Sequence, residues 1–188
     1  GDGGGGIKMY GGSLSNSIVS NNSTGGTSAS GGGILALDGS VTIQNVIVLD
    51  NFSIMHGGGA YFHNSNNSTI ENCTFSNNVA LSDTGFDGGG AIFCNESSIV
   101  IDSCIIENNS ASRGGGISVR KIGTAGYGIH ISNSVVSNNY AFSTAGGMYF
   151  DGRYSTSNSI IENVIISNNT GVNTGGVASV FGGNPQIY

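Results

Sequence analysis

The sequence of 188 residues has no tryptophan, a single proline and few charged side chains. Only 5 residues are lysine or arginine, against 11 that are aspartate or glutamate, which gives a formal net charge of −6. Because so few cations cannot form a basic patch for a phosphate backbone, we expect no nucleic-acid partner. No apolar run reaches the roughly 20 residues of a membrane-spanning helix, so we expect no membrane insertion by this segment.

Recognisable metal and cofactor motifs are also missing. Cys73, Cys94 and Cys104 form no CxxC pair and have no matching histidine spacing, which argues against a zinc site. We therefore expect neither a metal ion nor a cofactor. The sequence opens with Gly-Asp-Gly-Gly, without an initiator methionine or a signal sequence. We expect residues 1–188 to form a single domain within a longer protein.

Glycine is abundant instead, with 34 residues, and much of it recurs at regular spacing. Gly-rich triplets begin at Gly4, Gly31, Gly57, Gly88 and Gly114, with weaker copies at Ala145 and Thr174. A second motif, apolar-x-Asn-x-x-apolar-x-x-Asn, occurs six times, from Leu14–Asn22 to Ile161–Asn169. Self-similarity with a period of about 30 residues predicts a repeat architecture.

Within each repeat, apolar and polar residues alternate as they do in strands, and no stretch has a helical period. The pattern predicts three short strands per coil, with the first and third residues after each triplet facing inward. This register places Phe62 and Phe93 in contact in the core. One such coil cannot bury its apolar side alone, so the sequence predicts an all-β parallel solenoid of about six to seven stacked coils.

Two columns of asparagine run through the repeats. The first column consists of Asn22, Asn51, Asn78, Asn109, Asn139 and Asn169. Stacked amides bond to one another along the axis, so we expect this column to form a structural ladder. The second column consists of Asn16, Asn45, Asn72, Ser103, Asn133 and Asn163. Asparagine also tolerates the left-handed backbone that a sharp corner requires.

The motif GGAI at Gly89–Ile92, together with FxxN at Phe75–Asn78, resembles the repeat of the chlamydial polymorphic outer membrane proteins. The looser combination of GGGI with NNSA is similar to surface repeats of bacteria, archaea and protists. The resemblance covers nearly the whole chain and implies a right-handed parallel β-helix. It also implies an extracellular or cell-surface location and an adhesive or structural role. The implied partners are other copies or other surface proteins, arranged end to end or side by side, and glycans.

Because many parallel β-helices degrade polysaccharides, an enzyme is a serious alternative. Glu71, Asp102 and Glu162 fall in one outward column that Ser132 interrupts, and the cationic residues lie elsewhere in the coil. Acid and base chemistry needs clustered carboxylates, usually with a nearby cation. We therefore expect no catalytic residue, and we interpret the column as a solvated stripe, with a weak calcium site as the alternative.

An outward column of the first strand carries large apolar side chains, namely Leu35, Tyr61, Ile92 and Tyr149. An exposed stripe of this kind marks a contact surface. We therefore expect a non-enzymatic structural or adhesive protein that forms part of a surface filament or appendage. Since aromatic platforms also suit sugars, a carbohydrate-binding or polysaccharide-degrading β-helix is the alternative function.

Several residues carry secondary expectations. The sequons outside the two asparagine columns are candidate glycosylation sites: Asn21, Asn66, Asn67, Asn95, Asn108 and Asn168. The histidines, His56, His63 and His130, share no column and are expected to be isolated on the surface. Cys73 and Cys104 occupy the same position in neighbouring coils, so we expect buried thiols, with a disulfide between them as the alternative.

Overall fold

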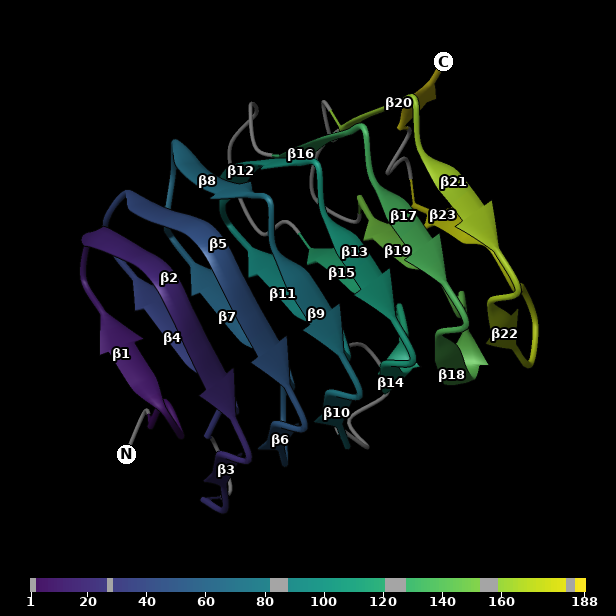
Figure 1. Cartoon of the computed structure of the whole chain (residues 1–188). Coiled ribbons are helices and arrows are strands. Elements are labelled where there is room, and N and C mark those ends of the chain that lie inside the picture. Colours follow the sequence, from purple (N-terminus) through teal and green to yellow (C-terminus); the bar gives the residue numbers. More distant parts are fainter. Residues whose placement is uncertain (1–2, 27–28, 82–87, 121–127, 153–158, 182–184) are drawn as a thin grey trace.

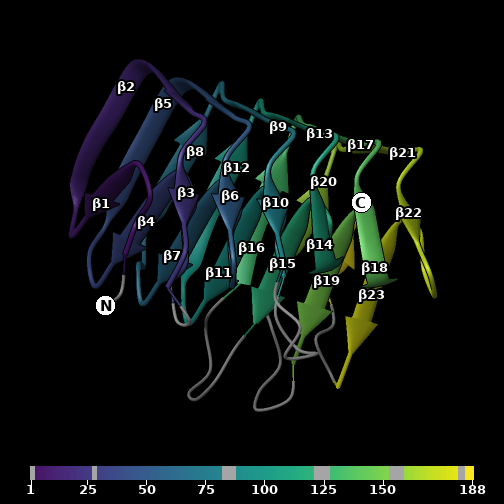
Figure 2. The same ribbon diagram turned by 90° about the horizontal axis from the view of Figure 1, so that it is seen from below.

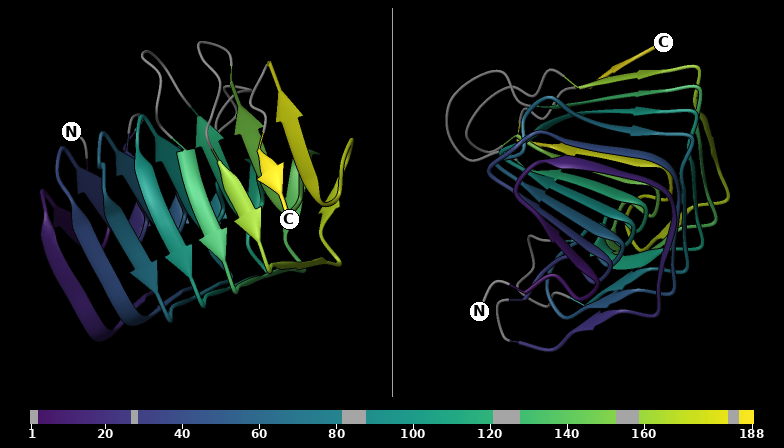
Figure 3. Two further views of the ribbon diagram at one scale, coloured as in Figure 1. Left: turned by 90° about the horizontal axis from the view of Figure 1, so that it is seen from above. Right: turned by 60° about the vertical axis from the view of Figure 1, so that its left-hand side comes forward.

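In a computed structural model, the chain winds into three parallel β-sheets around one axis (Figure 1). The structure describes residues 3–26, 29–81, 88–120, 128–152, 159–181 and 185–188. The coils lie side by side, from β1 at one end to β23 and β24 at the other (Figures 1 and 3). Within the described ranges, no helix is long and apolar enough to cross a membrane. The all-β parallel solenoid predicted from the sequence is confirmed.

Sheet A contains the strands that follow the Gly-rich triplets. It has seven strands: β1 (Ile7–Met9), β4 (Ile34–Leu37), β7 (Ala60–His63), β11 (Ile92–Asn95), β15 (Ile117–Arg120), β19 (Met148–Asp151) and β23 (Val177–Val180). Each strand pairs in register with the corresponding strand of the next coil.

Sheet B bends around a corner and contains the second and third strands expected for each coil. In the first two coils these are continuous, as β2 (Gly12–Ser20) and β5 (Val41–Leu49). In later coils each is split: β8 (Ser68–Glu71) and β9 (Thr74–Ser76), β12 (Ser98–Asp102) and β13 (Ile105–Glu107), β16 (Gly128–Ser132) and β17 (Val135–Ser137), β20 (Ile160–Glu162) and β21 (Ile165–Ser167). The last strand of the sheet is β24 (Gln186–Ile187).

Sheet C is formed by a further short strand in each coil that the sequence pattern did not predict. Its strands lie in one row in Figure 2: β3 (Ser23–Thr24), β6 (Phe52–Ser53), β10 (Val79–Ala80), β14 (Ser110–Arg113), β18 (Tyr140–Thr144) and β22 (Thr170–Gly171). The buried residues of these strands are small, as Ser53, Ala80 and Ala111 illustrate. Small residues in strands of two to five residues give almost no hydrophobic alternation, which explains why the sheet was missed.

Residues with a left-handed backbone occupy the corners between the sheets. Sheets A and B meet at Asp38, Asn64 and Glu96, and the bend of sheet B has the column that includes Asn16, Asn45 and Ser103. Sheets B and C meet at Asn21, Asp50, Asn77, Asn108, Asn138 and Asn168. Asparagine dominates these columns because its short polar side chain tolerates positive φ. The left-handed residue of the last column therefore lies directly before each ladder asparagine.

The register predicted for the fourth coil is wrong by one residue. Gly89 has φ +72° and matches Gly31 at +71° and Gly57 at +60°, so the fourth triplet begins at Gly89 and ends in Ala91. Glycine is required at this position, since a Cβ on Gly89 would lie 2.3 Å from the carbonyl oxygen of Ile92. The run of three glycines before Ala91 hid which glycine starts the corner.

This shift exchanges the two faces of β11. Ile92 and Cys94 face the core, where Cys94 pairs with Phe62 of the preceding coil. Phe93 pairs with Tyr61 on the outer face. The expected core contact between Phe62 and Phe93 is therefore wrong, because a slip of one residue turns every side chain of a strand to the opposite face.

Candidate binding cleft on the outer face of sheet A

The six ladder asparagines form an unbroken chain of hydrogen bonds between consecutive coils. From Asn22 to Asn139, the main-chain N and the Nδ2 of each residue donate to Oδ1 of the next, over 2.9–3.1 Å. Except at Asn22, each Nδ2 also donates to a main-chain carbonyl of the preceding coil. Every amide is thus used inside the solenoid, and the ladder is a structural element.

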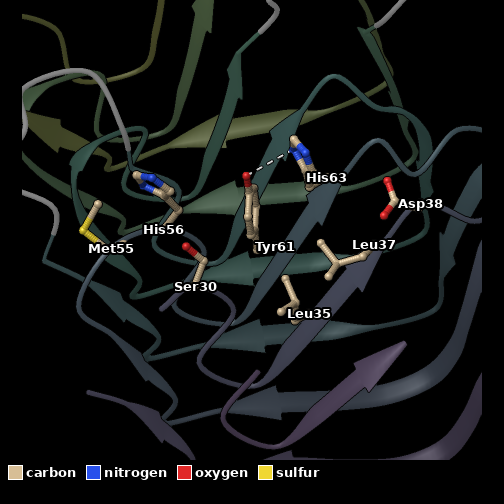
Figure 4. A pocket seen from close by; sticks show the side chains of 8 residues that line it. All are labelled: Ser30, Leu35, Leu37, Asp38, Met55, His56, Tyr61 and His63. Atoms are coloured by element: carbon tan, nitrogen blue, oxygen red, sulfur yellow. Dashed lines mark hydrogen bonds between the residues drawn. The ribbon is translucent and has the colours of Figure 1, made fainter. Parts of the chain in front are cut away.

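A cleft of about 450 Å³ opens on the outer face of sheet A (Figure 4). Strands β4 and β7 and the segments that flank them supply its lining: Ser30, Leu35, Leu37, Asp38, Met55, His56, Tyr61 and His63. A cavity of this size with an apolar base and a few polar groups has the usual character of a small-ligand site. The cleft was not predicted, because its residues come from different columns and from two corners of the coil.

Tyr61 and His63 form a hydrogen-bonded wall on one side of the cleft. The Tyr61 Oη lies 3.4 Å from Nδ1 of His63, as the dashed line in Figure 4 shows. Asn95 of the next coil places Nδ2 3.0 Å from the same Nδ1 and donates to Tyr61 Oη over 3.4 Å. The Nδ1 of His63 is thus held between the Tyr61 hydroxyl and the Asn95 amide.

The rings of His56 and Phe93 pack beside Tyr61 and extend this wall. The His56 ring centroid lies 4.9 Å from that of Phe93 and 5.8 Å from that of Tyr61, and the Tyr61 and Phe93 centroids are 5.3 Å apart. The segment around His56 thereby covers Phe93, which is only 1% exposed despite its outward position. His56 and His63 were expected to be isolated on the surface, and this expectation is wrong, since both line the cleft.

Asp38 supplies the only carboxylate among the eight lining residues, and none of the eight is lysine or arginine. It lies at the exposed corner between sheets A and B, with φ +54°, and its Oδ1 accepts a hydrogen bond from Asn64 Nδ2 over 3.0 Å. On the preceding coil, Lys8 pairs in register with Leu35, and its Nζ lies 5.2 Å from the centroid of the Tyr10 ring.

The expectation of an exposed contact stripe is largely wrong, because most of its residues are buried. The stripe was expected to consist of Leu35, Tyr61, Ile92 and Tyr149. Ile92 faces the core, and Phe93 takes its place in the column. Leu35 and Tyr149 are 1% and 2% exposed. Arg113 covers Tyr149, donating from Nη1 to its Oη over 3.2 Å. Only Tyr61 keeps part of its surface open, and it does so at the cleft.

An exposed apolar column exists instead on sheet B, where the sequence analysis did not place one. It runs in register through six coils as Ile18, Ile47, Thr74, Ile105, Val135 and Ile165. Ile18 and Ile165 are 67% and 62% exposed. These residues alternate with inward ones such as Val48 and Ile106, so the same period-two pattern could have found them.

The acidic column lies on sheet B, in the register expected for Glu71, Asp102, Ser132 and Glu162. Ser132 Oγ, Asn133 Nδ2 and Ser103 Oγ donate to Asp102 over 2.6, 2.7 and 2.8 Å. These hydrogen bonds, that of Ser132 above all, lower the pKa of the Asp102 carboxyl. In the part of the chain that the structure describes, no group of three or more His, Cys, Asp or Glu residues could hold a metal ion.

His130, on the same face of sheet B, is also not isolated. Its Nε2 lies 2.9 Å from Oε1 of Glu162, and both side chains are partly exposed, at 39% and 47%. An exposed pair of this kind contributes little to stability. The pair lies on sheet B, and neither of its residues lines the cleft on sheet A.

All three cysteines are buried and free. Cys73 and Cys104 lie in one column, and a hydrogen bond between the thiols lowers the pKa of Cys73 and raises that of Cys104. Burial raises the pKa of Cys94, which lies in the core. The arrangement is that of the reduced thiols, not of the disulfide alternative.

The sequons differ in accessibility. Asn21, Asn67, Asn108 and Asn168 are exposed at left-handed corners, and Asn66 is half-buried, with its Oδ1 accepting from the main chain of Ser98. Asn95 is only 9% exposed and contacts His63 and Tyr61. Asn95 is therefore excluded as a glycosylation site in the folded protein, because a glycan needs an open side chain.

Comparison with known proteins agrees with this geometry. The sequence profile of the family described as "Right handed beta helix region" matches residues 1–187. Neither the curated proteins nor the solved structures gave a match. The match spans nearly the whole chain and coincides with the stacked parallel coils. This chain therefore belongs to the right-handed beta helix family.

Proposed function

We propose that this chain is a non-enzymatic structural or adhesive β-helix at the cell surface, whose output is a rigid rod of defined length. The observation that carries the proposal is the uninterrupted Asn ladder from Asn22 to Asn169. The ladder joins every coil to the next through buried amides, so bending the rod would break several hydrogen bonds at once.

The distribution of reactive side chains supports a role without catalysis. Among the described residues, a histidine lies near a carboxylate in two places: Asp38 and His63 both line the cleft, and His130 contacts Glu162 on sheet B. Acid and base groups that act together must both lie within hydrogen-bond reach of one substrate. Neither the lining of the cleft nor that of the pocket beside His130 contains the lysine or arginine that usually accompanies such a pair.

The repeat motifs support the surface location. GGAI at Gly89–Ile92 falls at the true start of the fourth coil, and it resembles the repeat of the chlamydial polymorphic outer membrane proteins. In this proposal, other copies or other surface proteins contact the rod end to end or side by side, as in a filament or appendage.

Two measurements on the native source test this proposal. Antibodies raised against residues 1–188 should label intact cells, and added protease should remove the signal without lysis. The purified chain should release no product from acidic polysaccharides. Labelling only after permeabilisation would contradict the surface location, and product formation that Asp102→Asn abolishes would contradict the absence of catalysis.

The cleft beside Tyr61 favours one second candidate, a carbohydrate-binding β-helix. An exposed edge of an aromatic ring next to polar groups such as Ser30 and His63 is a common setting for a sugar. A glycan array tests it: binding that is lost in Tyr61→Ala and retained in Tyr140→Ala, an exposed tyrosine on sheet C, would support this function. An array without signal would exclude it.

A further inference from the structure

We propose that the cleft on sheet A binds an alkylammonium group, the chemistry shared by a lysine side chain and a free polyamine. The inference rests on the geometry of the cleft and does not depend on the location of the protein. It assigns a ligand class to the site from three features: an apolar base, an aromatic and imidazole wall without lysine or arginine, and a carboxylate at one end.

The base of the cleft suits a chain of methylene groups. Leu35 and Leu37 lie one behind the other on the outer face of β4, and Met55 closes the end beside His56 (Figure 4). Leu35 is fully buried, and Leu37 is half-buried. An alkyl chain lying along the partly exposed Leu37 and Met55 would remove apolar surface from water on both partners. A sugar would leave most of its hydroxyl groups unpaired over the same base.

The polar end of the cleft suits a cation. Asp38 is exposed, and the single hydrogen bond from Asn64 is to Oδ1. Glu96 occupies the same corner two coils further along but is not among the lining residues, so Asp38 is the one carboxylate of the lining. His63 lies at this end of the wall, with its Nδ1 3.0 Å from Asn95 Nδ2. An ammonium ion at this end would meet negative charge and no cation among the lining residues.

Lys8 lies on the coil that precedes β4, and it provides an internal check. It lies on β1 in register with Leu35, at the far side of the cleft from Tyr61. A positive charge there opposes an incoming ammonium group, whereas the carboxylate of Asp38 attracts it. The two charges must therefore affect the affinity in opposite directions.

The test is an NMR titration of the ¹⁵N-labelled chain with pentylammonium and, in parallel, with the neutral analogue 1-pentanol. At pH 8 the amine is charged and a free imidazole is neutral. Pentylammonium should shift the amide signals of Leu37, Asp38 and His63 and bind at least about threefold more tightly than pentanol. Nα-acetyl-lysine methylamide and spermidine, used as further probes, distinguish a protein lysine from a free polyamine as the source.

Two aspartates with nearly the same backbone give a matched pair of variants. Asp38 and Asp50 have φ +54° and +55°, and asparagine tolerates this conformation, so Asp38→Asn and Asp50→Asn should both fold. Asp38→Asn should weaken pentylammonium binding by about threefold or more, and Asp50→Asn, at a different corner, should leave it unchanged. Lys8→Gln should strengthen it by about twofold.

Each outcome decides between distinct claims. Equal binding of pentanol and pentylammonium, or an unchanged affinity in Asp38→Asn, would overturn the ammonium site. Binding of a neutral sugar that Asp38→Asn leaves intact would also overturn it, while supporting the carbohydrate-binding function. Absence of shifts at the cleft with every amine probe would overturn the ammonium site, and it would leave the structural role of the rod untouched.

Discussion

Asn78 and Asn109 occupy the same position on consecutive coils, and the main-chain N and Nδ2 of Asn78 both donate to Oδ1 of Asn109, at 2.9 and 3.0 Å. Both residues are buried, at 0% and 1% exposure. One carbonyl oxygen thus satisfies two donors of the neighbouring coil, and the pattern repeats along the axis. The ladder therefore repeats one hydrogen-bond pattern from coil to coil inside the solenoid.

Replacing one ladder residue should destabilise the protein measurably. Asn109→Ala removes the acceptor of Asn78 and leaves buried donors and carbonyls unpaired, so we expect a loss of about 1 to 3 kcal/mol in the free energy of unfolding. Urea denaturation followed by circular dichroism measures it. Gln44→Ala, which removes an exposed amide on sheet B, is the control and should stay within about 0.5 kcal/mol of wild type. Equal losses in both variants would contradict the structural role of the ladder.

The corrected register of β11 is tested by two isoleucines. Ile92 is fully buried, and Ile105 is 43% exposed on sheet B. Ile92→Ala should cost about 2 to 5 kcal/mol, through lost burial and the cavity left behind, and Ile105→Ala should cost clearly less. The same denaturation measurement applies. A loss below about 1 kcal/mol for Ile92→Ala would show that this side chain lies on the outer face after all.

The loss of folding stability at acidic pH should depend on Asp102. Its pKa lies below the unfolded value of about 3.9 because Ser132 and its neighbours donate to the carboxylate. A lowered pKa contributes stability above that value, and the contribution is lost as the pH falls through the folded pKa. Stability measured from pH 6 to pH 2 should therefore fall less steeply in Ser132→Ala than in wild type. Identical slopes would contradict the hydrogen bonds to Asp102.

The thiols should be protected but not bonded. All three cysteines are buried, so a thiol reagent such as 5,5′-dithiobis(2-nitrobenzoate) should react slowly with the native chain. In urea without reductant, three thiols per chain should react within minutes. Only one reactive thiol under these conditions would show that Cys73 and Cys104 form the disulfide instead.

Much of the fold could be predicted from the sequence, because stacked coils impose the same chemistry at the same position of every repeat. The inward positions of Val48, Phe75 and Ile106 follow directly from alternation around the second motif. The slip at Gly88 shows the limit of this approach. The sequence does not show which glycine of this run forms the corner. Only the positive φ of Gly89 in the structure identifies it.

The cleft could not be predicted in the same way. Asp38, His56 and Tyr61 come from a corner, a loop and a strand, so no column of the repeat contains all three. The burial of Asn95 likewise depends on contacts with the preceding coil and not on its sequon. The repeat pattern predicts the positions that all coils have in common. The cleft is built from residues that are not repeated in the other coils, so the pattern does not predict it.

Hydrogen exchange of the side-chain amides tests the central claim most directly. If the chain is a rod held together by a buried Asn ladder, the Nδ2 protons of Asn51, Asn78, Asn109 and Asn139 should exchange with D₂O far more slowly than those of exposed asparagines such as Asn67. We expect four strongly protected NH₂ groups by NMR. Exchange of all side-chain amides at the rate of free asparagine would contradict the ladder, and with it the proposed rigidity of the rod.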